Sequence, residues 1–150
     1  WNVTMASLDS TSRFGVLDLK AEARRTDEAI ARLRIRCESS RQLAARLSGG
    51  NQQKVVISKW LARGARIFLF DEPTRGIDVG AKAEVFDVMD ELARSGAAML
   101  MVSSEMPELL QVADRILVMR RGRIAGEAPG HATQEEIMRL AAFEANGKEA

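Results

Sequence analysis

Apolar residues recur along the first half of the chain with the spacing of two helices and a strand. Intervals of three and four residues predict an amphipathic helix over 18–37 and a second helix over about 51–63, which Gly64 is placed to end. The run Ile67–Phe70, closed by Asp71, is wholly apolar, as is typical of a strand buried on both faces of a sheet. The positions expected to face inward from the two helices are Leu19, Ala23, Ile30, Leu33, Cys37, Val56, Ile57, Trp60 and Leu61.

The same alternation continues through the second half of the chain. Helical spacing up to Gly96 is followed by an apolar strand over 97–102, and a third apolar strand is predicted over 116–119. The Arg121-Gly122 pair is expected to link this third strand to a short strand at 123–125 as a hairpin. The inward positions of the helix before Gly96 are Val85, Phe86, Met89, Leu92 and Ala93.

Two further helices complete the predicted order. Pro107 is suited to open a short helix, because the first turn does not use its missing N–H group. Thr133 and Glu136 have the spacing of a capping box, which predicts a last helix over about 134–144. Strands that alternate with helices in this way predict an α/β layered fold with a largely parallel sheet.

Composition narrows the class of protein. With 150 residues, of which 46% are hydrophobic and 29% charged, the chain can form a globular core, which excludes intrinsic disorder and collagen. Its longest apolar run, 97–102, is far shorter than the roughly 20 residues that cross a bilayer. The single cysteine, Cys37, excludes an internal disulfide, and a net charge of +1 indicates no strong affinity for polyanions.

Two acidic residues, Asp71 and Glu72, follow the strand at 67–70 directly. Ligands bind at the carboxyl ends of strands in open α/β sheets. One carboxylate there is suited to hold Mg²⁺, and a second is suited to orient a water aimed at a phosphoryl group. Taken alone, these acids are a weak signal, because many strands simply end in a solvated carboxylate.

Ser48, Gly49 and Gly50 stand immediately before the second predicted helix. Glycines at a helix entrance allow close approach of a ligand to free N–H groups, and the helix dipole favours an anion there. Taken alone, the same residues also fit a serine-capped helix after a glycine turn.

The order of these motifs resembles that of ATP-binding-cassette (ABC) ATPases: Leu-Ser-Gly-Gly at 47–50, a strand ending in Asp-Glu-Pro-Thr at 71–74, then Gly-Ile-Asp at 76–78. In that family these are the signature motif, the Walker B strand and the D-loop. Segments 48–54, 71–82 and 103–109 are most similar to the second cassette of the tandem ATPase subunits that drive monosaccharide importers.

The resemblance implies a fold and a division of the chain. We expect a P-loop NTPase-like parallel sheet with flanking helices, as an incomplete cassette with part of the helical subdomain at the N-terminus. Residues 1–46 would end that helical subdomain, which docks on transmembrane subunits in the family. Residues 47–127 would form the signature helix and the Walker B, D-loop and switch part of the core, and 128–150 a C-terminal helix and tail.

The resemblance also assigns roles across a dimer interface. Two cassettes close face to face in this family, so the signature motif would contact the γ-phosphate of an ATP held by the opposite cassette. Asp78 would act across the same interface. The residues expected to bind nucleotide in this way are Ser48, Gly49, Gly50, Asn51, Gln52 and Asp78.

On the chain's own side, the resemblance implies Asp71 as the Mg²⁺ ligand and Glu72 as the residue that polarises the attacking water. Ser104 stands where most cassettes have a catalytic histidine, and a serine hydroxyl cannot carry charge near neutral pH as imidazole can. His131 is expected to be a solvated loop residue. We therefore expect the chain's own ATP site to be slow or silent, and Ser48–Gly50 to serve the competent site of the other cassette.

No segment of the chain fits the phosphate-gripping pattern Gly-x-x-x-x-Gly-Lys-Ser/Thr. Together with Trp1 in place of an initiator Met, this predicts a C-terminal fragment of a cassette, which in isolation would neither bind ATP tightly nor hydrolyse it.

The function that follows from the resemblance is that of the ATP-binding subunit of a sugar ABC importer, peripheral to the cytoplasmic face of the plasma membrane. Its expected partners are a first cassette in the same polypeptide, transmembrane permease subunits and, indirectly, a sugar-binding protein, but not nucleic acid. One alternative is a cassette that acts on nucleic acid or the ribosome, which a net charge of +1 disfavours. Another is a non-hydrolysing half that only completes its partner's ATP site, which Ser104 favours and the Asp71-Glu72 pair opposes.

Overall fold

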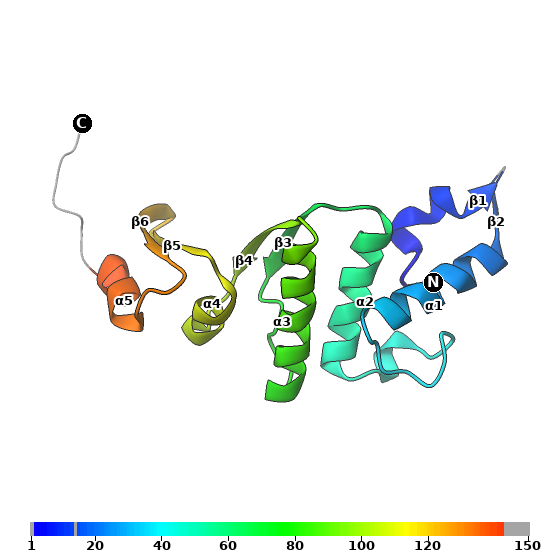
Figure 1. Cartoon of the computed structure of the whole chain (residues 1–150), viewed down its shortest axis with the longest axis horizontal. Helices are drawn as coiled ribbons and strands as arrows, with labels where there is room; N and C mark the ends of the chain where they lie inside the picture. Colours follow the sequence, from blue (N-terminus) through cyan, green and yellow to red (C-terminus); the bar gives the residue numbers. More distant parts are fainter. Residues whose placement is uncertain (1, 14, 143–150) are drawn as a thin grey trace. The chain divides into compact units, whose positions relative to one another are not determined.

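The computed structural model describes residues 2–13 and 15–142. The chain divides into two compact units, Trp1–Leu100 and Met101–Ala150. Figure 1 gives the order of the helices and strands along the chain. Among the described residues, no helix combines the length and the apolar character that a membrane span requires.

The first unit is mainly helical. Its elements are two 3-10 helices, η1 (Met5–Ser10) and η2 (Ala44–Arg46), the helices α1 (Leu19–Arg32), α2 (Gly49–Ala62) and α3 (Val79–Arg94), and the strands β1 (Ser12–Arg13), β2 (Val16–Leu17) and β3 (Ile67–Asp71). A further strand, β4 (Ala98–Val102), begins in this unit and ends in the second. Strands β1 and β2 form an antiparallel pair of two residues each, which is too short to show a hydrophobic period in the sequence.

Helix α1 is shorter than the helix that the sequence predicts. Asp18 caps its start, since the carboxylate accepts two first-turn N–H bonds at 3.0 Å. The helix ends at Arg32, and two residues later Arg34 adopts a left-handed φ of 51°. The predicted end at Cys37 is therefore wrong, because the backbone leaves the helical conformation before it.

The buried face of α1 also differs from the predicted apolar stripe. Leu19 is 61% exposed and Ala23 is exposed, whereas Glu22 and Thr26 are buried. The hydroxyls of Thr4 and Thr26 donate to the Glu22 carboxylate at 3.0 and 3.2 Å. Polar contacts therefore hold this face, and a reading of apolar spacing does not detect them.

Helix α2 begins two residues before its predicted start and ends just before Gly64, whose φ of 77° stops it as expected. Ile57 is 2% exposed, which confirms its inward position. Val56 and Trp60 are 45% and 48% exposed, so their predicted inward positions are wrong. Within the described chain, α2 contacts α1, α3 and η1. The Val56 and Trp60 side chains lie on the part of the helix surface that these elements do not contact.

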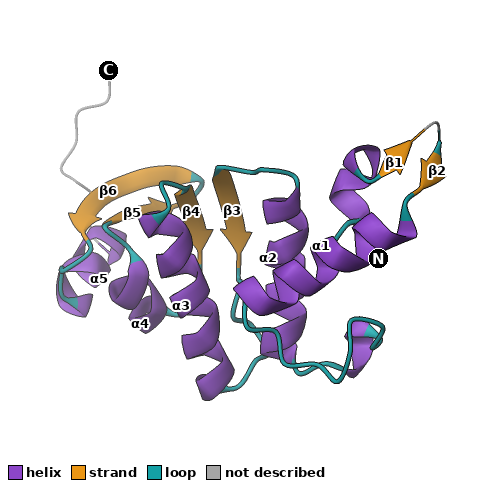
Figure 2. Cartoon of the chain, turned by 45° about the vertical axis from the view of Figure 1, so that its right-hand side comes forward, coloured by secondary structure: helices purple, strands orange, loops and turns teal. Residues whose placement is uncertain are grey.

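Strands β3 and β4 are hydrogen-bonded neighbours that α3 connects. Their arrows run in the same direction in Figure 2, and the Ala98 amide donates to the Arg66 carbonyl at 2.8 Å before β3 begins. Neighbouring strands of the same direction require such a crossover. This strand–helix–strand unit confirms the α/β class that the sequence predicts.

Burial along β3 alternates. Phe68 and Phe70 are buried and their rings stack with centroids 5.9 Å apart, while Ile67 and Leu69 are 73% and 76% exposed. The prediction that β3 is buried on both faces is wrong within the described chain, which covers only one face of this strand. In α3 the predicted inward residues Val85, Phe86, Met89 and Leu92 are each 6% exposed or less, whereas Ala93 is exposed.

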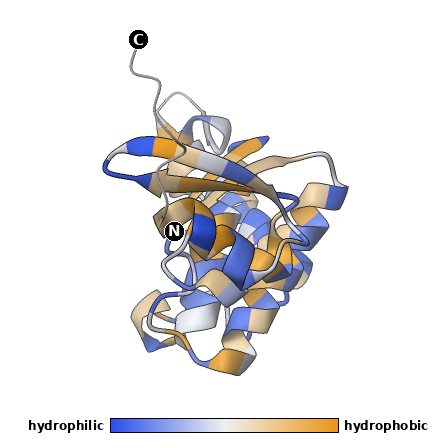
Figure 3. Cartoon of the chain, turned by 90° about the vertical axis from the view of Figure 1, so that its left-hand side faces the viewer, coloured by the Kyte–Doolittle hydropathy of each residue, from blue (hydrophilic) through white to orange (hydrophobic). Residues whose placement is uncertain are grey.

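The second unit consists of α4 (Met106–Val112), β5 (Arg115–Arg120), β6 (Arg123–Pro129) and α5 (Gln134–Ala142). Pro107 lies in the first turn of α4, as predicted. Strands β5 and β6 form the expected hairpin around Arg121-Gly122, antiparallel and with β6 four residues longer than predicted. The core of the second unit consists of Ile116, Val118, Ala128, Ala132 and Ile137. Figure 3 colours the chain by hydropathy and shows hydrophobic and hydrophilic residues interspersed along the helices and strands.

The capping box at the start of α5 is confirmed. The Thr133 amide donates to the Glu136 carboxylate at 2.7 Å, and the Glu136 amide donates to the Thr133 hydroxyl at 3.2 Å. The N–H and O–H groups of Thr133 both donate to the Glu136 carboxylate, and these bonds hold the pKa of Glu136 below its ordinary value. The last two residues of the predicted helix, 143 and 144, lie outside the described residues.

Candidate functional site

Ser48 forms the N-cap of α2 but leaves the helix start uncapped. Its backbone is extended, with φ −60° and ψ 156°, and its side chain makes no capping hydrogen bond. The hydroxyl oxygen instead accepts a bond from Asn51 Nδ2 at 2.8 Å. The first N–H groups of a helix have no partner within it, so those of Gly49 and Gly50 point out of the end of α2. The entrance of α2 therefore has the donors that an anion requires.

Asn51 and Gln52 use their amide groups on the chain itself. Asn51 Oδ1 accepts the Arg36 amide at 2.8 Å, while its Nδ2 holds Ser48, so both ends of the buried side chain are occupied. Gln52 Nε2 donates to the Leu47 carbonyl at 2.9 Å. Both residues thus fix the shape of the turn at 47–51.

The two glycines are needed for packing inside the chain as well as for an open helix entrance. A Cβ at Gly49 would lie 2.5 Å from Ile77 Cγ2, and a Cβ at Gly50 would lie 2.6 Å from Ala81 Cβ. Both distances are shorter than real carbon contacts. Side chains larger than hydrogen would therefore push the start of α2 away from the start of α3.

Asp78 lies in this junction as the N-cap of α3. Its Oδ1 accepts the Ala81 amide at 2.9 Å, and the residue is exposed. The structure thus brings Gly49 and Gly50 together with the segment that holds Asp78, although the two motifs are 26 residues or more apart in the sequence.

Asp71 and Glu72 lie where the sequence places them, at the carboxyl end of β3. Asp71 is exposed, and Glu72 has a left-handed φ of 47° in the turn that leads through the buried Pro73 and Thr74. Non-glycine residues with positive φ are uncommon and often occur at functional sites. In Figures 1 and 2 the end of β3, the start of α2 and the start of α3 lie on the same side of the first unit.

The carboxylates at this edge of the sheet suit Mg²⁺ better than a metal ion whose ligands all come from protein side chains. Among the described residues, no cluster of three or more His, Cys, Asp or Glu side chains is placed to hold a metal ion. Mg²⁺ needs only one or two carboxylates when waters and phosphate oxygens supply its other ligands. The two adjacent carboxylates Asp71 and Glu72 are chemically suited to such an ion.

Ser104 belongs to the second unit, in the loop between β4 and α4, and is exposed. The neighbouring Ser103 hydroxyl donates to the buried Glu108 at 2.8 Å and accepts the Glu105 amide at 3.0 Å. This bond pair fixes the turn on which Ser104 lies. His131 is exposed, which agrees with its expected place in a loop.

A group of charged residues beside the turn was not found from the sequence. Lys54 of α2 is buried and contacts Glu84 of α3, and Glu84 also contacts Arg36. Nothing in the sequence singles out this lysine, which stands between the polar residues 51–53 and the apolar residues 55–57. Its partner lies 30 residues away, so no local pattern connects the two.

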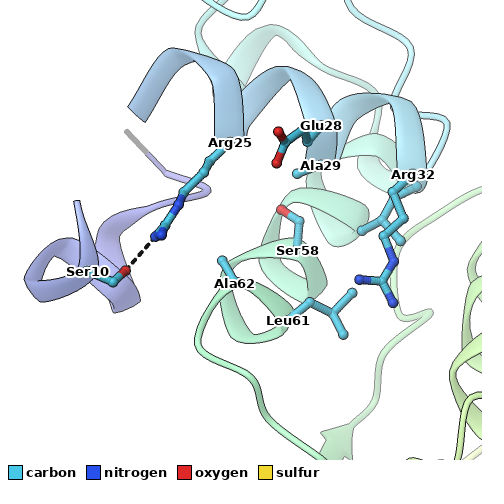
Figure 4. A pocket seen from close by; sticks show the side chains of 9 residues that line it. Ser10, Arg25, Glu28, Ala29, Arg32, Ser58, Leu61 and Ala62 are labelled. Atoms are coloured by element: carbon cyan, nitrogen blue, oxygen red, sulfur yellow. Dashed lines mark hydrogen bonds between the residues drawn. The ribbon is translucent and has the colours of Figure 1, made fainter. Parts of the chain in front are cut away.

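A cavity of about 380 Å³ lies elsewhere in the first unit, between η1, α1 and α2. Figure 4 shows its lining, in which Arg25 donates to Ser10. Other residues of the lining are Glu28, Arg32, Ser58 and Leu61. None of the predicted site residues lines it, so it is separate from the helix entrance at Ser48.

Comparisons with known proteins show which family the chain resembles in sequence. A family model described as ABC transporter matches residues 2–75. The ribose import ATP-binding protein RbsA 2 of Escherichia coli O157:H7 is 52% identical over 141 residues, which is 93% of this chain and 28% of that protein. The ribose import ATP-binding protein RbsA of Bacillus subtilis is 51% identical, over 93% of this chain and 29% of that protein. The chain thus spans less than a third of the length of these relatives.

Solved structures show the same fold. A nucleotide-free ATP-binding cassette from an ABC transporter superposes with a TM-score of 0.74 at 22% identity, over 93% of this chain and 56% of that one. A dimeric cassette in a post-hydrolysis state, bound to ADP and Pi, superposes with a TM-score of 0.65 at 20% identity, over 81% and 52%. The fold is that of an ATP-binding cassette. The chain belongs to the ABC transporter family, which confirms the resemblance found in its motifs.

Proposed function

We propose that this chain is part of the ATP-binding subunit of a sugar ABC importer, in which ATP hydrolysis between two cassettes drives carbohydrate uptake. The observation that carries the proposal is the identity of 50% or more with ribose import ATP-binding proteins over 93% of the chain. Within it, residues 1–46 end the helical subdomain, 47–127 form the distal part of the core, and 128–150 form the C-terminal helix and tail.

The entrance of α2 is proposed to bind the γ-phosphate of an ATP held by an opposite cassette. The N–H groups of Gly49 and Gly50 and the helix dipole supply a site for an anion. Because the Ser48 oxygen already accepts the bond from Asn51, its own hydroxyl hydrogen is left to donate to phosphate. Asn51 and Gln52 act through the turn that they hold, and Asp78 acts from the same junction across the interface. A similar cassette solved as a dimer with ADP and Pi supports this arrangement.

Asp71 and Glu72 are proposed to serve the chain's own nucleotide site. Asp71 would hold Mg²⁺, which neutralises phosphate charge when it is bound, and Glu72 would orient the attacking water. In the sequence, Ser104 stands where most cassettes have a histidine, so the resemblance implies that the chain's own site lacks a group that can take up charge. We therefore infer that it hydrolyses ATP slowly or not at all.

The proposed partners follow from the same role. They are a first cassette in the same polypeptide, transmembrane permease subunits on which the helical subdomain docks, and a sugar-binding protein that acts through the permease. This places the subunit peripherally at the cytoplasmic face of the membrane. The net charge of +1 gives no support for a nucleic-acid partner.

Transport in proteoliposomes tests the proposal. The complete ATP-binding protein that carries this chain, its permease and its sugar-binding protein should accumulate a monosaccharide only when ATP is present inside. ATP turnover that no monosaccharide stimulates, together with stimulation by RNA or ribosomes, would favour the nucleic-acid alternative and contradict the proposal.

The substitution Glu72→Gln tests whether the chain's own ATP site is slow or competent in hydrolysis. We expect this substitution to lower ATP turnover of the complete transporter by no more than about threefold, because the competent site uses the water-orienting carboxylate of the other cassette. Single-turnover and steady-state hydrolysis measure the effect, and the equivalent Glu→Gln change in the other cassette is the matched control. Loss of nearly all turnover in Glu72→Gln alone would show that the chain's own site is the competent one.

A further inference from the structure

Lys54 is a buried charge that the roles above do not use. It lies in the second turn of α2, and its side chain is only 4% exposed. Its ammonium group donates to Glu84 Oε2 at 2.8 Å and to the Arg34 carbonyl at 3.4 Å. A buried ammonium group is costly unless such partners surround it. The side chain therefore ties α2 both to α3 and to the segment that follows α1.

Glu84 joins two cations from different parts of the chain. Its Oε2 holds Lys54, while its Oε1 lies 2.9 Å from the Arg36 guanidinium. The hydrogen bond from Lys54 holds the pKa of Glu84 below its ordinary value, against the opposing effect of desolvation. The carboxylate therefore remains ionised at neutral pH, and its contribution to stability is lost as the pH falls through that lowered pKa.

The contacts of Arg36 extend this group to the turn at Ser48. The Arg36 amide donates to Asn51 Oδ1 at 2.8 Å, and Asn51 Nδ2 donates to the Ser48 hydroxyl oxygen at 2.8 Å. The contacts thus link Glu84 on α3, through the exposed side chain and then the backbone of Arg36, to Asn51 and Ser48 at the entrance of α2. Such a series restricts each side chain more than an isolated pair would.

The two helices are tied at two levels. At their starts, Gly49 and Gly50 fit against Ile77 and Ala81. Farther in, Lys54 and Glu84 meet, each six residues beyond the N-cap of its helix, Ser48 or Asp78. Two separated contacts prevent both sliding and tilting of one helix start against the other, whereas the glycine contacts alone would allow tilting.

We propose that Glu84 is a positioning residue that, by holding Lys54 and Arg36 together, fixes the turn Ser48–Asn51 against the start of α3 at Asp78. The two helix starts are thereby presented as one rigid surface. The effect on ATP rests on the proposed function, since it requires that this surface meets the nucleotide of the opposite cassette. The effect on the rigidity of the turn does not.

Hydrogen exchange on the complete ATP-binding protein, without ATP, tests the rigidity directly. Glu84→Gln keeps the shape of the side chain and removes its charge. We expect the amides of Arg36 and Gln52, which donate to Asn51 Oδ1 and to the Ser48 carbonyl, to exchange about tenfold faster in this variant, while those of the central turns of α3 remain protected. Glu91→Gln is the matched control, because Glu91 lies on the same helix, pairs with Arg34 and is half exposed. It should leave exchange unchanged.

ATP kinetics of the reconstituted transporter provide the second measurement. Glu84→Gln and Lys54→Met should each raise the ATP concentration for half-maximal turnover about five- to tenfold, with a smaller change in the maximal rate. Lys54→Arg, which keeps the charge, should behave as wild type. A purely structural role would lower the amount of folded protein without this split.

The outcomes separate this inference from the proposed function. Unchanged exchange at Arg36 and Gln52 in Glu84→Gln, or exchange accelerated equally throughout α3, overturns the positioning role. Faster exchange confined to these two amides of the turn supports it even where ATP turnover proves insensitive to the turn, a result that would count against the proposed function alone. Equal behaviour of Lys54→Arg and Lys54→Met also overturns the role of the charge pair.

Discussion

Ser48→Arg should reduce ATP turnover of the complete transporter by about 100-fold or more, the scale seen when a preorganised oxyanion donor is lost. The arginine side chain would fill the space in front of the Gly49 and Gly50 amides and keep the opposite nucleotide from them. Ser48 is exposed, and its substitution also removes the acceptor of the Asn51 Nδ2 bond, so the free energy of unfolding should fall by about 0.5 to 1.5 kcal/mol, which leaves the protein folded. Steady-state ATP hydrolysis and thermal unfolding measure the two effects.

Ser40→Arg is a suitable control for this substitution. Ser40 is also exposed, lies in the loop before η2 and belongs to none of the motifs, so the same added bulk and charge should leave turnover unchanged. If Ser48→Arg retained wild-type turnover, the assignment of the α2 entrance to an opposite nucleotide would be wrong.

Gly50→Ala should destabilise the first unit by about 1 to 3 kcal/mol, the usual range for overpacking. The added Cβ would lie 2.6 Å from Ala81 Cβ. Both Cβ atoms are bonded directly to helical backbone, so neither can rotate away from the other. The helices would have to separate, which would also displace the Ser48 turn and lower turnover. Native-state hydrogen exchange of the α2 and α3 amides measures the stability change.

Two companion variants isolate the steric cause. Gly80→Ala places a Cβ 3.4 Å from the nearest atom, Asp78 Oδ1, which is an ordinary contact, so it should be neutral or slightly stabilising in a helix. Combining Gly50→Ala with Ala81→Gly removes the clashing methyl group and should recover part of the loss. A Gly50→Ala protein as stable as Gly80→Ala would show that α2 and α3 are not held by this contact.

The buried face of a helix can be predicted from the sequence only where apolar side chains form that face. The inward residues of α3, such as Val85 and Met89, are apolar and are buried within the chain, so helical spacing located them. In α1 the buried positions are Glu22 and Thr26, and the Glu22 carboxylate accepts from both Thr26 and Thr4. Apolar spacing does not register a face that is held by hydrogen bonds, so it wrongly placed Leu19 and Ala23 inward, whereas the predicted inward Leu33, just after the helix, is 3% exposed.

The candidate site likewise contains residues that the sequence identifies and residues that it does not. Its motif residues were found because the type of residue carries the chemistry: acids at a strand end and glycines at a helix entrance. Lys54 and Glu84 were missed because each is ordinary by itself. Their meaning comes from a contact across 30 residues, between two helices whose separation the sequence does not state.

The sequence by itself determined the order of helices and strands through most of the chain, the family, and the identity of the residues at the helix entrance and the strand end. These depend on local spacing and on side-chain chemistry, which are written in the sequence. Only the tertiary structure decided that Gly49 and Gly50 fit against Ile77 and Ala81, and that Glu84 joins Lys54 to Arg36. Such close approach depends on how helices far apart in the chain pack together, and no local pattern of residues specifies that distance.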